Sequence, residues 1–230
     1  MIRRRGLVIL VAVLLSAWGT VWLFSDQASP LFKPIEHYEL AGELSFLEPE
    51  EVDQVLGHYF GTSFWQIELN TIQSELIRLE WVSQAVVKRH WPNRIYVEIK
   101  EQRPVARWGS SALINQEGEI FSPKKYDEFD SLVLLEGEPD DAKKILSAFS
   151  SFQEQLTNVG FTISSLKHQL DGVWRIKLVN GSEIILDSKE GGHKLETFIM
   201  AYPQLVKTLR KSAQAYDLRY SNGFIVGKSQ

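Results

Sequence analysis

The chain has 230 residues, a formal net charge of −4 and no cysteine. The absence of cysteine excludes disulfide bonds, thiolate metal sites and a cysteine nucleophile, and the slightly negative charge gives no case for nucleic-acid binding. Hydrophobic residues make up 44% of the chain and charged residues 23%, so the composition is that of a globular protein.

The first feature along the chain is an uncharged run, residues 6–24, directly after three arginines at positions 3–5. As a helix, these residues would span about 28 Å, which is close to the hydrocarbon thickness of a bilayer. The positive-inside rule keeps the arginines in the cytoplasm. We therefore predict a cytoplasmic tail over residues 1–5 and a transmembrane helix over 6–24, in contact with inner-membrane lipid.

A cleaved signal peptide is the alternative interpretation of this run. The run is longer than the usual apolar core of such a peptide, and Asp26 stands where a cleavage site needs a small residue. An uncleaved anchor is favoured. It predicts a single-pass type II membrane protein with its C-terminus outside the cytoplasm, and the lack of cysteine fits the periplasm behind a bacterial inner membrane.

A first domain is predicted over residues 35–104, after a linker over 25–34 that contains two prolines. A short strand over 35–40 precedes two amphipathic helices, whose apolar residues recur at helical spacing. Strict alternation then predicts a hairpin of two strands, joined at Trp91-Pro92-Asn93. The expected order is β-α-α-β-β, with the hairpin strands at residues 82–90 and 94–101.

A larger α+β domain, dominated by antiparallel strands, is predicted over residues 105–230. Asn-Gly pairs and short alternating segments predict its hairpins. The predicted hairpins are 112–114 with 120–121, 173–179 with 183–187, and 215–220 with 224–226; the predicted helices are 140–156 and 193–209. Pro203 should kink or restart the second helix, whose inward face is predicted to include Leu205, Val206 and Leu209.

Motifs for catalysis are weak. Ser122 with Lys125 and Ser164 with Lys167 match S-x-x-K, but Pro123 interrupts the first and the second falls in an expected strand. The five histidines follow no metal-binding spacing. We predict no catalytic, metal or cofactor site and no small-molecule substrate. The alternative is an anchored periplasmic enzyme that modifies peptidoglycan.

A basic patch surrounds the first predicted hairpin, where Lys88, Arg89 and Arg94 accompany Trp91 and Tyr96. A solvated face and a docking surface explain it about equally well, because aromatic side chains are enriched at interfaces.

Two stretches carry a resemblance to a known family. Residues 81–108 combine Trp81-Val82, a basic-aromatic-proline turn at 88–92, and the pattern E-x-x-P-V-A-R-W. Far downstream, residues 216–220 read Y-D-L-R-Y and are followed by Asn222-Gly223. Together with the single predicted anchor, these motifs resemble the bacterial FtsQ/DivIB family of cell-division proteins, in which a POTRA domain follows one membrane helix. A POTRA-bearing transport component would instead need a long β-barrel region, which residues 105–230 are too few to supply.

The resemblance implies a non-enzymatic scaffold of the divisome at the division septum. It implies binding to FtsB and FtsL, a link between early and late division proteins, and contact with other divisome membrane proteins. In the family, the last strands take up a strand of FtsB, and a short strand near Phe224 is plausible as the sheet edge that does so. By match, Tyr220 is the aromatic anchor. Where relatives can carry a tryptophan after the final strand, this chain has Lys228.

The site residues that the resemblance implies form two groups. The FtsB-binding residues are Leu218, Arg219, Tyr220, Asn222, Gly223, Phe224, Ile225 and Val226. The residues of the POTRA domain that match positions for recruitment by upstream division proteins are Gln84, Val87 and Arg89.

Overall fold

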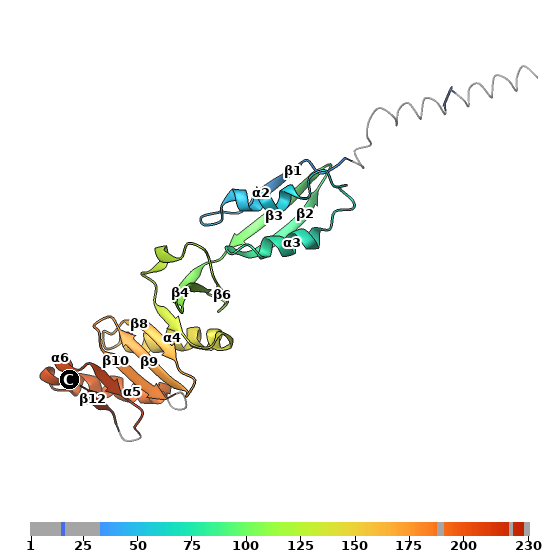
Figure 1. Cartoon of the computed structure of the whole chain (residues 1–230). Coiled ribbons are helices and arrows are strands. Elements are labelled where there is room, and N and C mark those ends of the chain that lie inside the picture. Colours follow the sequence, from blue (N-terminus) through green and yellow to red (C-terminus); the bar gives the residue numbers. More distant parts are fainter. Residues whose placement is uncertain (1–14, 17–32, 188–190, 221–222, 228–230) are drawn as a thin grey trace, which may run out of the picture. The chain divides into compact units, whose positions relative to one another are not determined.

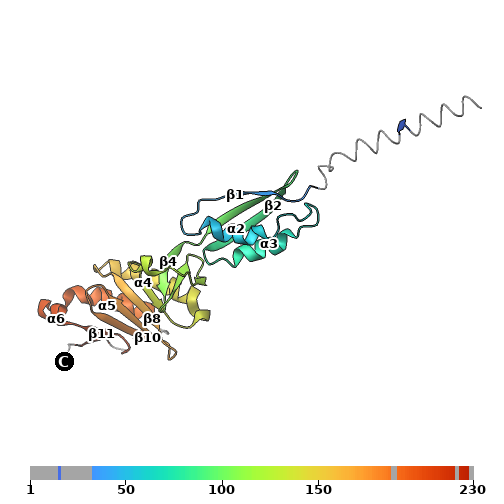
Figure 2. The same cartoon turned by 45° about the horizontal axis from the view of Figure 1, so that its top comes forward.

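The computed structural model describes residues 15–16, 33–187, 191–220 and 223–227 (Figures 1 and 2). The predicted tail, most of the predicted membrane helix and most of the linker lie outside these residues. Among the helices that the structure describes, none has the length and apolar character needed to cross a bilayer. The chain divides into two compact units, with the boundary after Gln102.

The N-terminal unit follows the predicted β-α-α-β-β order, which is thereby confirmed. Its elements are β1 (His37–Ala41), α2 (Pro49–Gly57), α3 (Leu69–Ile77), β2 (Val82–His90) and β3 (Arg94–Glu101). The sheet has the order β1-β3-β2, in which β1 runs parallel to β3 and β2 runs antiparallel to it. The β2 strand is therefore one edge of this sheet.

Alternation along β3 produces the core of this unit. Ile95, Val97 and Ile99 are buried, while the residues between them face away from the core. The helices cover the buried face with apolar side chains one turn apart, Val52 and Leu56 from α2 and Ile72 and Leu76 from α3.

Glu101, the first residue of the E-x-x-P motif, holds the loop between β1 and α2. Its carboxylate accepts the backbone N–H groups of Ser45, Phe46 and Leu47 at 2.9, 3.0 and 2.7 Å. Gly42 at the start of that loop has a φ of 127°, and a Cβ there would lie 2.3 Å from the carbonyl oxygen of Ile99. Only glycine fits this close approach.

The C-terminal unit is an α+β structure built on one large sheet, with strand order β12-β11-β10-β9-β8-β7-β4-β5-β6. Its strands are β4 (Pro104–Trp108), β5 (Ala112–Asn115), β6 (Ile120–Phe121), β7 (Leu134–Glu136), β8 (Ile163–His168), β9 (Val173–Leu178), β10 (Glu183–Asp187), β11 (Ala215–Asp217) and β12 (Ile225–Gly227). Five of the neighbouring pairs are antiparallel and three are parallel.

Helices supply two of the parallel crossovers. The helix α4 (Ala142–Thr157) connects β7 to β8, and α5 (Gly191–Ala201) with α6 (Lys207–Ser212) connects β10 to β11. Both α4 and α5 pack on the sheet and bury an apolar stripe, which includes Phe152 and Phe198. Phe152 meets Trp174 of β9 edge to face, with ring centroids 5.7 Å apart.

One expectation for this unit is confirmed and two need correction. The predicted helix over 193–209 is broken by a 3₁₀ turn at Tyr202–Gln204, because Pro203 cannot donate the helical hydrogen bond. Val206 was expected to face inward, but its side chain is 62% exposed just after this break. The final hairpin is shorter than predicted, since β11 ends at Asp217 rather than at residue 220. Strand β4 was not predicted.

Candidate partner-binding edge

The strand β12 is the last strand of the large sheet and pairs on one side only among the described residues. It runs antiparallel to β11, with Tyr216 opposite Val226 and Asp217 opposite Ile225. The other side of β12 has no neighbouring strand in the part of the chain that the structure describes. A strand in this position can accept a further strand through its backbone groups.

Aromatic packing fixes the start of β12. The ring of Phe224 lies 5.1 Å from that of Phe198 in α5 and 6.5 Å from that of Tyr216. Tyr216 is almost fully buried, and burial, followed by the neighbouring Tyr202, raises the pKa of its hydroxyl to about 12. The hydroxyl therefore stays neutral at physiological pH, which suits its place in an apolar core.

The segment after β11 is held by ionic hydrogen bonds. The guanidinium of Arg219 donates to the carboxylate of Asp217, from Nε at 2.9 Å and from Nη2 at 2.7 Å. These hydrogen bonds hold the pKa of Asp217 below its usual value and raise that of Arg219. The carbonyl of Arg219 accepts a hydrogen bond from Lys194 of α5 at 3.2 Å. Arg219 is thus engaged within the chain.

A small cavity of about 90 Å³ lies between this segment and α5. Four predicted residues line it, namely Leu218, Tyr220, Gly223 and Phe224, together with His193, Lys194 and Thr197. Tyr220 is 52% exposed and Ile225 is 51% exposed, whereas Leu218 is buried. The structure thus brings these predicted residues together at one edge, while Asn222 lies outside the described residues. The three residues of α5 carry no local signal that links them to β12, so the sequence did not indicate them.

The three predicted recruitment residues are not brought to one face. Gln84, Val87 and Arg89 all lie on the edge strand β2, but Gln84 alternates to the face opposite Val87 and Arg89. Arg89 also has a structural role. Its guanidinium donates hydrogen bonds to the carbonyls of Phe64 and Ile67 at 2.9 and 2.6 Å. The basic patch is therefore partly engaged within the chain, since Arg94 also pairs with Glu39.

Arg89→Ala is expected to lower the free energy of unfolding of the N-terminal unit by about 1–3 kcal/mol, because it leaves two carbonyls without their charged donor. Gln84→Ala, at an exposed position of the same strand, should change it by less than about 0.5 kcal/mol. Urea unfolding followed by circular dichroism measures both. Equal stability of the two variants would contradict the structural role of Arg89.

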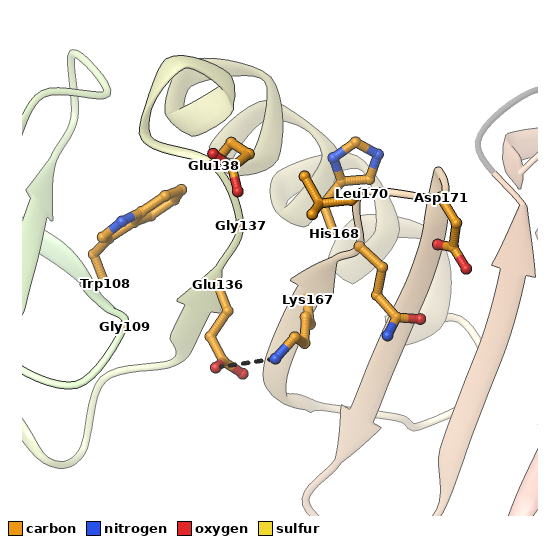
Figure 3. Close-up of a pocket in the computed structure, with 10 residues that line it drawn as sticks. Trp108, Gly109, Glu136, Gly137, Glu138, Lys167, His168, Leu170 and Asp171 are labelled. Atoms are coloured by element: carbon orange, nitrogen blue, oxygen red, sulfur yellow. Dashed lines mark ion pairs between the residues drawn. The ribbon is translucent and has the colours of Figure 1, made fainter.

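A cavity of about 590 Å³ in the C-terminal unit lies at the carboxyl ends of the parallel strands β4, β7 and β8 (Figure 3). Glu136 and Lys167 form an ion pair across it at 3.5 Å. The His168 ring is tilted against the ring of Trp174, with centroids 4.1 Å apart, and its Nδ1 lies 3.2 Å from Asp141. The described residues that line this cavity include no serine, threonine or cysteine.

The second S-x-x-K match is also explained by the fold. Ser164 and Lys167 lie on β8, Ser164 at a shift in the register with β9, and each is bound to a different partner. The Ser164 hydroxyl donates to the carbonyl of Lys177, and Lys167 pairs with Glu136. Among the described residues, no group of three or more histidines and carboxylates is placed to hold a metal ion.

Comparison with known proteins identifies the family. A model described as "Cell division protein FtsQ/DivIB, C-terminal" matches residues 106–219, and one described as "POTRA domain, FtsQ-type" matches residues 33–102. The Cell division protein FtsQ of Shewanella oneidensis is 32% identical over 204 residues, which cover 89% of this chain and 77% of that protein. The chain belongs to the FtsQ/DivIB family.

Two further FtsQ relatives match over similar lengths. The protein of Allochromatium vinosum is 31% identical over 216 residues, which cover 94% of this chain and 86% of that protein. The protein of Coxiella burnetii is 28% identical over 198 residues, which cover 86% of this chain and 82% of that protein. The N-terminal unit is thus an FtsQ-type POTRA domain. The FtsQ/DivIB match ends at residue 219, so Tyr220 and β12 lie beyond it.

Proposed function

We propose that this FtsQ-family chain is a non-enzymatic scaffold of the divisome that binds FtsB at the open edge of β12. In this proposal, residues 6–24 anchor it in the inner membrane as a single-pass type II protein at the septum. FtsL joins through the same complex, and the scaffold links early and late division proteins. The observation that carries the proposal is the side of β12 that has no strand neighbour among the described residues, together with the exposed Tyr220.

In strand addition at this edge, backbone hydrogen bonds supply affinity and side-chain contacts supply specificity. An incoming FtsB strand would take up the backbone donors and acceptors on the open side of β12. Tyr220 and the small cavity beside it would supply side-chain contacts, since partly exposed aromatic residues are frequent hot spots. Anchoring in one membrane raises the local concentration of both partners, so a short strand suffices.

Aromatic packing and ionic hydrogen bonds within the chain hold this edge in place. Phe224 is locked against α5, and Arg219 is locked by Asp217 and Lys194. The chain therefore presents Tyr220 directly after Arg219 and Ile225 directly after Phe224, and both of these preceding residues are held by contacts within the chain. A preorganised edge loses little conformational entropy on binding, which favours association.

Tyr220→Ala tests the proposal. Truncation of a hot-spot aromatic costs about 2 kcal/mol, so the dissociation constant for the periplasmic segment of FtsB should rise about thirtyfold. Titration of the full-length chain in nanodiscs measures this constant. Leu170→Ala is the matched control, because Leu170 is still more exposed and lies in the turn between β8 and β9, which β10 and β11 separate from β12 in the sheet order. Unchanged binding by Tyr220→Ala, at unchanged thermal stability, would remove Tyr220 from the site.

Depletion of the protein in its source organism tests the cellular role. A division scaffold predicts filamentous cells, because septation stops while growth continues. Lysis or altered peptidoglycan composition without filaments would instead favour the anchored enzyme.

A further inference from the structure

Three large aromatic side chains are exposed at one end of the POTRA unit. Phe60 is 43% exposed, Trp65 is 54% exposed and Trp91 is 59% exposed. Phe60 and Trp65 belong to the loop between α2 and α3, and Trp91 belongs to the turn between β2 and β3. We call these three residues the aromatic tip.

Backbone hydrogen bonds join the segments of the aromatic tip to the start of the unit. The N–H of Ile35 donates to the carbonyl of Thr62 at 3.0 Å, and the N–H of Gly61 donates to the carbonyl of Ile35 at 3.0 Å. The N–H of Glu36 donates to the carbonyl of Asn93 at 3.3 Å. Residues 34–36 are therefore bound between the two aromatic segments, at the end of the sheet where β1 begins (Figure 1).

Arg89 links the same two segments from the other side. It precedes Trp91 by two residues, and its Nη2 donates to the carbonyl of Trp65 at 3.5 Å, in addition to its bonds to Phe64 and Ile67. The edge-to-face contact of Phe64 with Trp65, at 5.2 Å, fixes the Trp65 ring further. The segments that carry the exposed Trp65 and Trp91 are thus held together by hydrogen bonds.

The length of the preceding chain limits how far the aromatic tip can lie from the bilayer. The predicted membrane helix ends at Phe24, and only residues 25–32 separate it from Lys33. A fully extended chain advances at most about 3.3–3.6 Å per residue, so this segment reaches about 30 Å. The end of the unit that carries exposed tryptophans is therefore also the end tethered next to the membrane.

The chemistry of the tip fits a lipid headgroup region. Tryptophan is enriched at membrane interfaces, where its ring meets acyl chains and its N–H meets headgroups. Two lysines at this end, Lys33 and Lys88, are exposed and suit phosphate groups of anionic lipids. We propose that the aromatic tip docks the POTRA unit onto the periplasmic surface of the inner membrane. This inference rests on the anchoring by residues 6–24 proposed above.

The test uses the cysteine-free background of the chain. Gln66→Cys places a nitroxide label beside Trp65 at an exposed position and keeps all three aromatic residues. The full-length chain is reconstituted in vesicles of phosphatidylethanolamine and phosphatidylglycerol. Collision of the label with oxygen, which concentrates in lipid, and with a water-soluble nickel chelate reports its depth. Leu15→Cys marks the predicted membrane helix, and Ile77→Cys marks an exposed site at the far end of α3.

The expected ratio of oxygen to nickel collisions at residue 66 lies several-fold above that at residue 77 and below that at residue 15. Adding Trp65→Ala and Trp91→Ala should return residue 66 to the value of residue 77. A lipid-like value at residue 15 with an aqueous value at residue 66 would overturn the docking of the tip alone. An aqueous value at residue 15 would overturn the anchoring proposed above. A label at residue 66 that is shielded in native membranes, yet aqueous in pure lipid, would assign the tip to a protein partner and overturn lipid docking.

Discussion

Phe198→Ala should lower the free energy of unfolding of the C-terminal unit by about 3–5 kcal/mol, the usual cost of removing a buried phenylalanine. Phe198 is fully buried in α5, and its ring contacts four other aromatic rings, those of Phe161, Tyr202, Tyr216 and Phe224. Because Phe224 leads into β12, the cavity that Phe198→Ala leaves beside Phe224 should also loosen the binding edge. Urea unfolding measures the first effect, and titration with FtsB measures the second.

Met200→Ala is the matched control for this prediction, since Met200 lies on the same helix but is exposed. Its free energy of unfolding should change by less than about 0.5 kcal/mol. If the two alanine variants unfolded at the same urea concentration, the aromatic cluster could not be what holds α5 against the sheet.

Proline in β12 should separate sheet pairing from partner binding. Successive N–H groups along a strand point to opposite sides, so Ile225 and Val226 direct theirs to different neighbours. Proline at the position that faces the open side leaves the pairing with β11 intact but removes a donor for the incoming strand. We expect one of Ile225→Pro and Val226→Pro to keep its melting temperature and to bind FtsB about tenfold to a hundredfold more weakly.

The other proline variant should lose stability, because it breaks the pairing with β11. Ile120→Pro in β6, at the opposite edge of the same sheet, controls for a general effect of proline on an edge strand. If Ile225→Pro and Val226→Pro each remained folded and each bound FtsB with unchanged affinity, FtsB would not add a strand at β12.

The elements that could be predicted are those whose sequence pattern is local. The strands β2 and β3 have the predicted bounds because Ile95, Val97 and Ile99 alternate strictly with polar residues. The break in the last long helix was likewise indicated by one residue, Pro203. In both places, backbone chemistry and periodicity decide the structure before any distant contact forms.

The elements that could not be predicted depend on distant partners or on side-chain hydrogen bonds that periodicity does not reveal. Strand β4 begins at a proline and contains Arg107, and its neighbours β5 and β7 come later in the chain. The strand β11 ends early because the Asp217 carboxylate accepts the N–H of Arg219 at 3.1 Å, a local bond that competes with the ladder.

The candidate site shows the same division. The exposed Tyr220 and the sheet edge after Phe224 were expected from the family motif, whereas His193, Lys194 and Thr197 reach the edge only through the crossover helix α5. The role of the recruitment residues stays a prediction, but the fold separates their side chains. A list of Gln84, Val87 and Arg89 suggests one surface, but alternation along β2 sends them to two faces. Sequence matches identify positions, and the fold decides which positions act together.

Hydrogen exchange at β12 tests the central claim most directly. The full-length chain in nanodiscs is incubated in deuterated buffer with and without the periplasmic segment of FtsB, and exchange of the peptide that contains Ile225–Gly227 is followed by mass spectrometry. Strand addition predicts that FtsB slows exchange at β12 and leaves β6, at the other edge, unchanged. Unchanged exchange at β12 under saturating FtsB, with protection elsewhere on the chain, would contradict the account.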